Sequence, residues 1–192
     1  QRYSYSEEEG TNCTDSPCNI QYNIDTFYNM VRIGITPTFE IRPYNDLNFT
    51  DLSSTITGIQ GKINLYSSDE NSHAFGILVS GDRSSSQITS SALGLWDFGG
   101  DMWSGWINGG AIMQLDNGNV TPTTTVGFGT TIGTDHNIYS ELVYTQDSRP
   151  NVIVSGGYYK VFANYQLDFF ALKNLTSYKT WQVGIGFSWK IK

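Results

Sequence analysis

The sequence predicts an all-β fold, a transmembrane antiparallel up-and-down β-barrel of about 8–10 strands. The first observation behind it is a strict apolar–polar alternation in the last predicted strand, Thr180–Ile191, and the second is its recurrence upstream. The third is composition, because only 15% of the 192 residues are charged, 14% are aromatic and 20 are Gly. No apolar run approaches the roughly 18 residues that indicate a transmembrane helix.

The last predicted strand has large apolar residues at nearly every odd position and small or polar residues at every even position. Because side chains alternate between the two faces of a strand, one face is apolar and the other polar. Its twelve residues exceed the roughly 9–11 that cross a bilayer as a tilted strand. Trp181 and Trp189 lie near its two ends, where membrane barrels carry interfacial aromatic residues.

The apolar face recurs in five upstream segments, which are Val31–Ile41, Thr57–Leu65, Phe75–Val79, Val126–Ile132 and Tyr159–Phe169. In chain order, nine strands are predicted, at 31–42, 54–66, 73–81, 87–98, 103–115, 123–133, 136–144, 151–170 and 180–191. Bacterial single-chain barrels have even strand numbers. Either a segment before residue 31 supplies a tenth strand, or two of these segments merge to leave eight.

Turn residues separate the predicted strands. Gly99-Gly100-Asp101 is a strong turn signal, and Pro43–Ser53, with its Pro, Asn and Asp residues, is predicted to be a loop. Pro37 predicts a local break within its strand, and Gly156-Gly157 is expected to bend the long segment 151–170. With both termini in the periplasm, the turn at Thr134-Asp135 is expected on the extracellular side.

Residues 1–30 form an acidic N-terminal arm, and residues 31–192 form the barrel. The arm is expected outside the barrel, within it as a plug, or as an irregular first strand. Cys13 and Cys18 lie close together within it, and a local disulfide is typical of exported proteins. Two thiols are the alternative, whereas zinc is disfavoured because two cysteines leave its tetrahedral shell half empty. A first residue of Gln indicates a mature form with its signal peptide removed, or a trimmed sequence.

The segment Gln182–Trp189, Q-V-G-I-G-F-S-W, resembles the assembly signal of terminal strands in bacterial outer-membrane barrels. That signal has the form polar-x-Gly-x-x-aromatic-x-aromatic, and the segment is similar at every defined position. The chain departs from it by continuing with Lys190-Ile191-Lys192. The resemblance implies a small bacterial outer-membrane β-barrel protein, embedded in the lipid bilayer of the outer membrane.

The polar face of the predicted strands carries charges of both signs. Unpaired buried charge is costly, so we expect these side chains to pair in a network that locks the barrel; a narrow ion or solute path is the alternative. The predicted lumen network is Arg32, Glu40, Arg42, Lys62, Glu141, Lys160 and Asp168. The predicted membrane-interface aromatic residues are Trp103, Tyr159, Phe169, Trp181 and Trp189.

Composition and spacing disfavour several functions. A net charge of −7 with no basic patch argues against nucleic acid, whose phosphates require Lys and Arg. His73 and His136 are the only histidines. His136 and Ser140 share a face but lie roughly 13 Å apart on a strand, too far for a nucleophile–base contact. We predict no enzyme activity and no catalytic, metal or cofactor-binding residue.

The predicted function is that of an integral outer-membrane β-barrel with a structural or surface-interaction role, such as a subunit of an envelope complex. A protein partner would bind through the N-terminal arm or through the loops at Ser67–Ser72, Gly99–Met102 and Lys173–Ser177. One alternative is a narrow porin-like channel. The other is a soluble secreted β-sandwich that binds glycans or proteins, since alternation and frequent turns suit that fold too.

Overall fold

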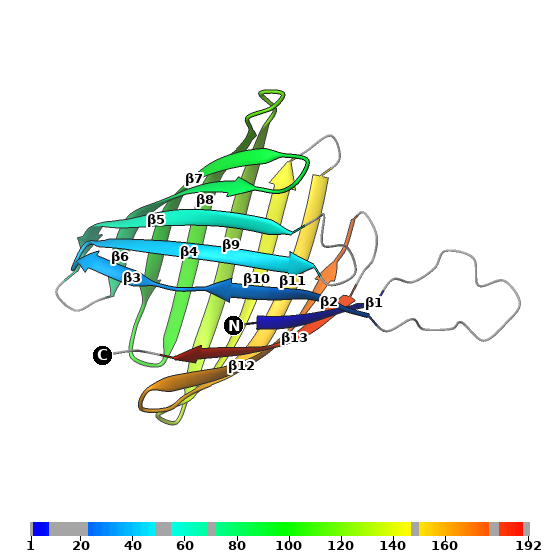
Figure 1. The fold of residues 1–192 in the computed structure, drawn as a ribbon. Coiled ribbons are helices and arrows are strands. Elements are labelled where there is room, and N and C mark those ends of the chain that lie inside the picture. The colour runs from blue at the N-terminus through cyan, green and yellow to red at the C-terminus, as the bar shows by residue number, and fades with distance from the viewer. Residues whose placement is uncertain are drawn as a thin grey trace, which may run out of the picture.

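The structure, a computed structural model, describes residues 2–7, 23–48, 55–68, 72–146, 150–176 and 181–189. Within these ranges no helix is long and apolar enough to cross a membrane. The strands form one antiparallel sheet (Figure 1). They are β1 (Arg2–Glu7), β2 (Asn23–Met30), β3 (Ile33–Thr36), β4 (Phe39–Asn48), β5 (Ile56–Ser67), β6 (His73–Arg83), β7 (Ile88–Gly99), β8 (Trp103–Gln114), β9 (Val120–Ile132), β10 (His136–Gln146), β11 (Pro150–Val161), β12 (Tyr165–Asn174) and β13 (Trp181–Trp189).

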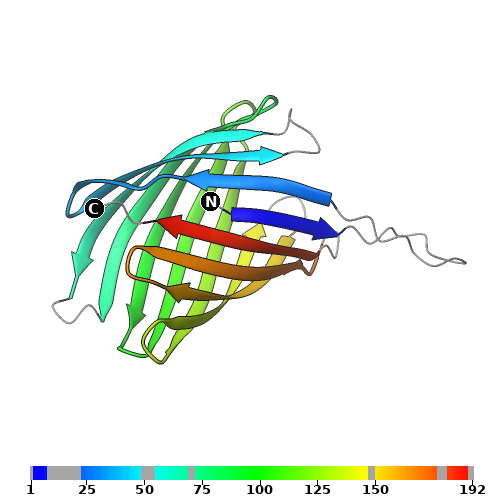
Figure 2. The same ribbon diagram turned by 60° about the horizontal axis from the view of Figure 1, so that its bottom comes forward.

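The strand pairings run around a ring (Figures 1 and 2). Each strand from β4 to β13 pairs with the next, β13 pairs with β1, and β2 pairs with both β1 and β4. β3 continues β2 along β4 in the same register, since Met30 faces Tyr44 and Ile33 faces Ile41. The ring therefore has twelve strand positions, an even number as in bacterial single-chain barrels, and the predicted up-and-down β-barrel fold is confirmed.

Pro43 explains the gap between β2 and β3. The Val31 N–H donates to the Pro43 carbonyl oxygen at 3.0 Å, but proline has no N–H with which to return a bond. The hydrogen-bond ladder with β4 is therefore interrupted at Pro43, and β3 continues in the direction of β2. The predicted loop over Pro43–Ser53 is wrong at its start, because β4 extends to Asn48.

The predicted count of 8–10 strands is too low for three reasons. Segment 31–42 contains a turn at Pro37-Thr38, and β3 and β4 pair on either side of it. Segment 151–170 contains a second turn between β11 and β12, where the Phe162 N–H donates to the Tyr165 carbonyl oxygen at 2.7 Å. The N-terminal arm adds β1 and β2 to the sheet.

Both termini point to the same end of the barrel, because β1 and β13 are antiparallel neighbours (Figure 2). We call this the turn end, and the opposite end the loop end. The turn end carries the connections at 37–38, 68–72, 100–102, 133–135 and 162–164. Thr134-Asp135 therefore lies at the same end of the barrel as the start of β1 and the end of β13, not at the opposite end as predicted, because the missed turn at 162–164 inverts the order. Two of the loops predicted to bind a partner, Ser67–Ser72 and Gly99–Met102, lie at the turn end, and Lys173–Ser177 lies at the loop end.

Most large apolar side chains point outward, whereas a few, such as Leu78, Leu93 and Phe170, occupy inner positions. Among the described residues no apolar side chain is buried, and many large ones are exposed, such as Ile59 at 54%, Val183 at 48% and Ile185 at 51%. A β-sandwich would bury its apolar face between two sheets, and the described residues contain no such core. An apolar outer face with a polar inner face is the arrangement of a membrane barrel.

Aromatic rings form a belt on the outer face at the turn end. Six rings on β5 to β9 contact each other in series, with centroids 5.0–6.3 Å apart. We call this series the aromatic girdle; its members are Tyr66, Phe75, Trp96, Phe98, Trp103 and Phe128. Aromatic residues at this level are typical of the membrane–water interface.

Candidate functional site: the barrel lumen

The inner face of β8 to β12 is a grid in which large side chains alternate with glycine. Facing residues on antiparallel strands share one face of the sheet, so the register gives the rows directly. In order from the turn end, the rows are Thr131, Asn137, Tyr159 and Asp168; then Ser104, Gly129, Tyr139, Gly157 and Phe170; then Trp106, Gly127, Glu141 and Ser155.

Trp106 lies across the neighbouring strand. A Cβ on Gly127 would overlap the indole at Cε2, so only glycine allows this approach. The indole Nε1–H donates to Glu141 Oε1 at 3.0 Å. Trp106 therefore reaches from β8 over β9 to β10, with one face of its ring against the barrel wall.

Two more large inner side chains lie over glycines in the same way. A Cβ on Gly157 would sit 2.6 Å from the Tyr139 ring, and one on Gly186 would overlap Asp168 Oδ1. Asp168 is only 3% exposed. These side chains therefore lie along the wall, over the backbone of the neighbouring strand.

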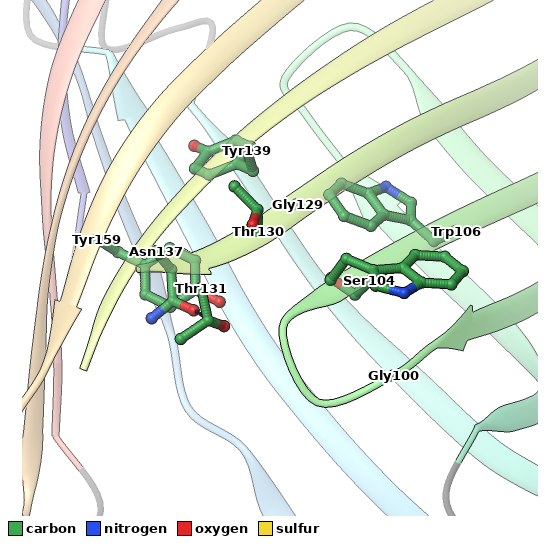
Figure 3. Close-up of a pocket in the computed structure, with 10 residues that line it drawn as sticks. Gly100, Ser104, Trp106, Gly129, Thr130, Thr131, Asn137, Tyr139 and Tyr159 are labelled. Atoms are coloured by element: carbon green, nitrogen blue, oxygen red, sulfur yellow. Dashed lines mark hydrogen bonds between the residues drawn. The ribbon is translucent and has the colours of Figure 1, made fainter. Parts of the chain in front are cut away.

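A recess of about 150 Å³ lies between these side chains near the turn end. In Figure 3, Trp106 and Ser104 lie on one side, and Tyr139, Asn137 and Tyr159 on the other. Thr131 Oγ1 donates to Asn137 Oδ1 at 2.8 Å, which orients that amide. The residues lining the recess are Gly100, Trp103, Ser104, Trp106, Gly129, Thr130, Thr131, Asn137, Tyr139 and Tyr159.

Four of the predicted lumen charges gather on the wall formed by β4, β5 and the residue just before β3. We call Arg32, Glu40, Arg42 and Lys62 the basic wall. Glu40 Oε1 accepts a hydrogen bond from Arg42 Nε at 2.5 Å and lies 3.7 Å from Arg32 Nε. Lys62 faces Glu40 in the register. From β6 to β13, the inner positions that the structure describes carry no Lys or Arg.

The opposite side of the lumen, which we call the aromatic wall, is the inner face of β8 to β12 with Trp106, Tyr139, Glu141, Tyr159 and Asp168. β4 and β10 are six strand positions apart in either direction around the ring, so the two walls face each other. Over the described inner face, the basic residues are Arg32, Arg42 and Lys62 of the basic wall and Arg2 on β1, which pairs with Gly186 opposite Asp168. The acidic ones are Glu40, Asp46, Asp82, Asp97, Glu141 and Asp168.

Lys160 and Tyr159 lie on the faces opposite to those predicted. Lys160 shares the outer face with Leu142 and Val154, and its Nζ lies 3.5 Å from Asp135 Oδ2. Tyr159 is on the inner face, opposite Asp168. The reason is the unrecognised hairpin: Val161 pairs with Gln166, so the outward positions change from even numbers on β11 to odd numbers on β12.

The other predicted interface aromatic residues fall in different places. Trp103 belongs to the aromatic girdle, and Trp181 lies at the loop end, where Lys173 Nζ is 4.4 Å from its ring centroid. Phe169 is 49% exposed on the outer face but lies in the middle of β12. The side chain of Trp189 and the predicted disulfide of Cys13 and Cys18 lie outside the described residues.

Groups with acid–base or metal-binding chemistry are sparse in the described ranges. No cluster of three or more His, Cys, Asp or Glu side chains there could hold a metal ion. His136 lies on the outer face, with Nδ1 2.6 Å from the Tyr158 hydroxyl oxygen and Nε2 3.5 Å from Asp135 Oδ1. The sequence predicted neither this contact nor the recess.

Comparison with solved structures finds barrels of outer-membrane channels. The KdgM porin superposes with a TM-score of 0.75 at 10% identity over 100% of both chains. The same porin in complex with disordered oligogalacturonate gives 0.75 at 11% identity, again over 100% of both chains. An outer membrane channel from Pseudomonas putida F1 gives 0.69 at 12% identity, over 97% of this chain and 91% of that one. No family model and no curated protein matches. These likenesses show a shared β-barrel fold, as predicted from the sequence.

Proposed function

We propose that the chain is a narrow porin-like channel of the bacterial outer membrane that passes small uncharged and cationic solutes. The observation that carries this proposal is the open inner face. Among the described residues, no apolar side chain is buried and Asp168 alone is a buried polar one. A barrel with a purely structural role would be expected to fill its interior with packed side chains.

The size of the ring supports an open lumen. Twelve strands spaced about 4.8 Å apart and tilted by about 40° place the backbone roughly 12 Å from the barrel axis. The same geometry gives about 8 Å for eight strands, a width that side chains just fill. The extra radius leaves room for a solute path, and the glycine-seated side chains of the aromatic wall do not occupy it.

The charges of the lumen support the proposed preference for uncharged and cationic solutes. One solved neighbour is a porin in complex with oligogalacturonate, which is a polyanion. From Arg32 to β13, the inner positions hold six acidic and three basic residues, and Arg2 on β1 adds a fourth basic one, so acidic residues are in excess. Charged rings of one sign favour ions of the other sign, so we expect anionic solutes to be disfavoured here.

Conductance in planar bilayers tests the proposal. The protein, folded in detergent, is expected to give unitary currents, with a reversal potential in a KCl gradient that indicates cation preference. Glu141→Gln should weaken that preference, and the matched variant Arg42→Gln on the opposite wall should strengthen it. Folded, membrane-inserted protein without unitary current would overturn the channel and leave the structural or surface-interaction role, whose partner would be sought at the loops.

A further inference from the structure

The recess in the aromatic wall combines flat rings with hydroxyl and amide groups, and the Glu141 carboxylate accepts a hydrogen bond from one of those rings, Trp106. We infer that it is a binding site for one sugar ring of a neutral saccharide. This inference rests on the proposed channel function and adds a solute class to it. A volume of about 150 Å³ is below the roughly 300–1,000 Å³ of sites for drug-sized ligands. The recess therefore takes a single ring, with the rest of an oligosaccharide extending along the lumen.

The rings supply a platform for the apolar side of a sugar. Trp106 and Tyr139 each rest on the glycine of the next strand, Gly127 and Gly157, so one face of each ring is left toward the lumen. Gly129 lies between them, and a Cβ at this position would sit 3.7 Å from Trp106 Cζ3. One side of a pyranose presents only C–H groups, which pack against an aromatic face and make weak contacts with its π-system.

Polar groups line the recess beside this platform. Ser104, Asn137 and Tyr159 line the recess (Figure 3). Between them they offer hydroxyl groups, which both donate and accept, and an amide that does both with separate atoms. Glu141 is fixed by the Trp106 N–H, and a carboxylate has capacity for further donors. A hydroxyl that donates to a carboxylate makes a strong, charge-assisted bond.

The same groups select against an acidic sugar. Glu141 lies beside the platform, and Asp168 faces Tyr159 in the register. The described inner positions of β6 to β13 supply no Lys or Arg to pair with a uronate carboxylate. An acidic ring would bring like charges together without a partner, which is unfavourable in a confined site. Neutral hydroxyls find both donors and acceptors there.

Cellotriose is the probe, and trigalacturonate is its acidic counterpart. Cellotriose should interrupt the ion current and change the tryptophan fluorescence of the detergent-solubilised protein. The affinity for trigalacturonate should be at least about tenfold lower in both measurements. Trp106→Ala should lower the affinity for cellotriose by about tenfold, which corresponds to about 1.4 kcal/mol. Trp106→Phe keeps a flat ring and should retain most of the affinity. Trp96→Phe, on the outer face, should change nothing.

The two readouts separate the failure of this site from the failure of the channel. Current without block, together with fluorescence that cellotriose does not change, would overturn the saccharide site and leave the channel intact. Cellotriose-dependent fluorescence in a protein that gives no current would keep the site and overturn the channel. Equal binding of the two trisaccharides, or undiminished block in both Trp106 variants, would also contradict the inference.

Discussion

The two walls of the lumen are both polar, but they hold their polar groups in different ways. On the basic wall, charges contact charges: Glu40 lies between Arg32 and Arg42, and the side chain of Arg32 is 66% exposed. On the aromatic wall, Trp106 rests on a glycine and donates to Glu141. The first arrangement is a cluster of ion pairs, with Arg32 largely exposed and Glu40 and Arg42 at 29% and 12% exposure, whereas the second depends on close contact with the backbone.

The two walls show that polar side chains on the inner face of a barrel can be held either by ion pairs or by packing against glycine. Exposed ion pairs contribute little to stability because solvent screens them and long side chains lose entropy. A ring packed on a glycine is fixed by steric fit, so a single methyl group can displace it. We therefore expect the aromatic wall to determine both the shape of the lumen and its sensitivity to substitution.

The largest expected effect comes from Gly127→Ala. The new methyl group would overlap the Trp106 indole and force it off the wall toward the lumen, at a cost of about 1–3 kcal/mol. Urea unfolding in lipid vesicles should show this loss, and unitary conductance should fall. Gly109→Ala is the matched control, because a Cβ there has nothing within 4 Å. If the two variants behave alike, the indole does not rest on Gly127.

A smaller effect is expected from Glu141→Gln. This change replaces a charged acceptor of the Trp106 N–H with a neutral one, and the difference between such hydrogen bonds is about 1 kcal/mol. The free energy of unfolding should fall by that amount, and tryptophan emission should shift. Asp97→Asn, an exposed inner acid on β7, is the control. An equal loss in both variants would indicate that stability depends on the negative charge of the lumen and not on the hydrogen bond between Trp106 and Glu141.

The smallest effect is expected on the basic wall, from Glu40→Gln. Glutamine keeps an oxygen that accepts from Arg42 Nε, and the contact with the 66% exposed Arg32 is screened by solvent, so the loss in unfolding free energy should stay below about 1 kcal/mol. The measurement is again urea unfolding in vesicles. A loss larger than that of Glu141→Gln would reverse the comparison and support the locking network predicted from the sequence.

The alternation in the sequence was enough to predict the fold and most outward positions. Ile59, Ile63, Phe75, Ile77 and Val126 are all exposed, as predicted. The wrong faces come from a turn that lacks most of the usual residues. At 162–164 the chain reads Phe-Ala-Asn, so apolar residues continue through the turn and only Asn marks it. Because this hairpin was not predicted, the alternation of β12 was extended back through β11, and Tyr159 and Lys160 were assigned to the wrong faces.

The recess could not be predicted in the same way, because its residues come from four strands whose register depends on the turns between them. Trp106 and Gly127 face each other, yet nothing local links them. One signal was present: Trp106 breaks the alternation of its segment. A bulky residue on the otherwise small and polar face needs space on a neighbouring strand, and glycine provides it.

The aromatic girdle is continuous over β5 to β9 at the turn end, whereas the outward residues described at the loop end are mostly aliphatic, such as Ile88, Met113 and Val120. Interfacial rings anchor a protein at the headgroup level, and aliphatic side chains tolerate a shift in depth. In a bilayer of altered thickness, the turn end should act as a pivot while the loop end rises or sinks. Adaptation to the membrane would then leave the recess, which lies near the turn end, at a constant depth.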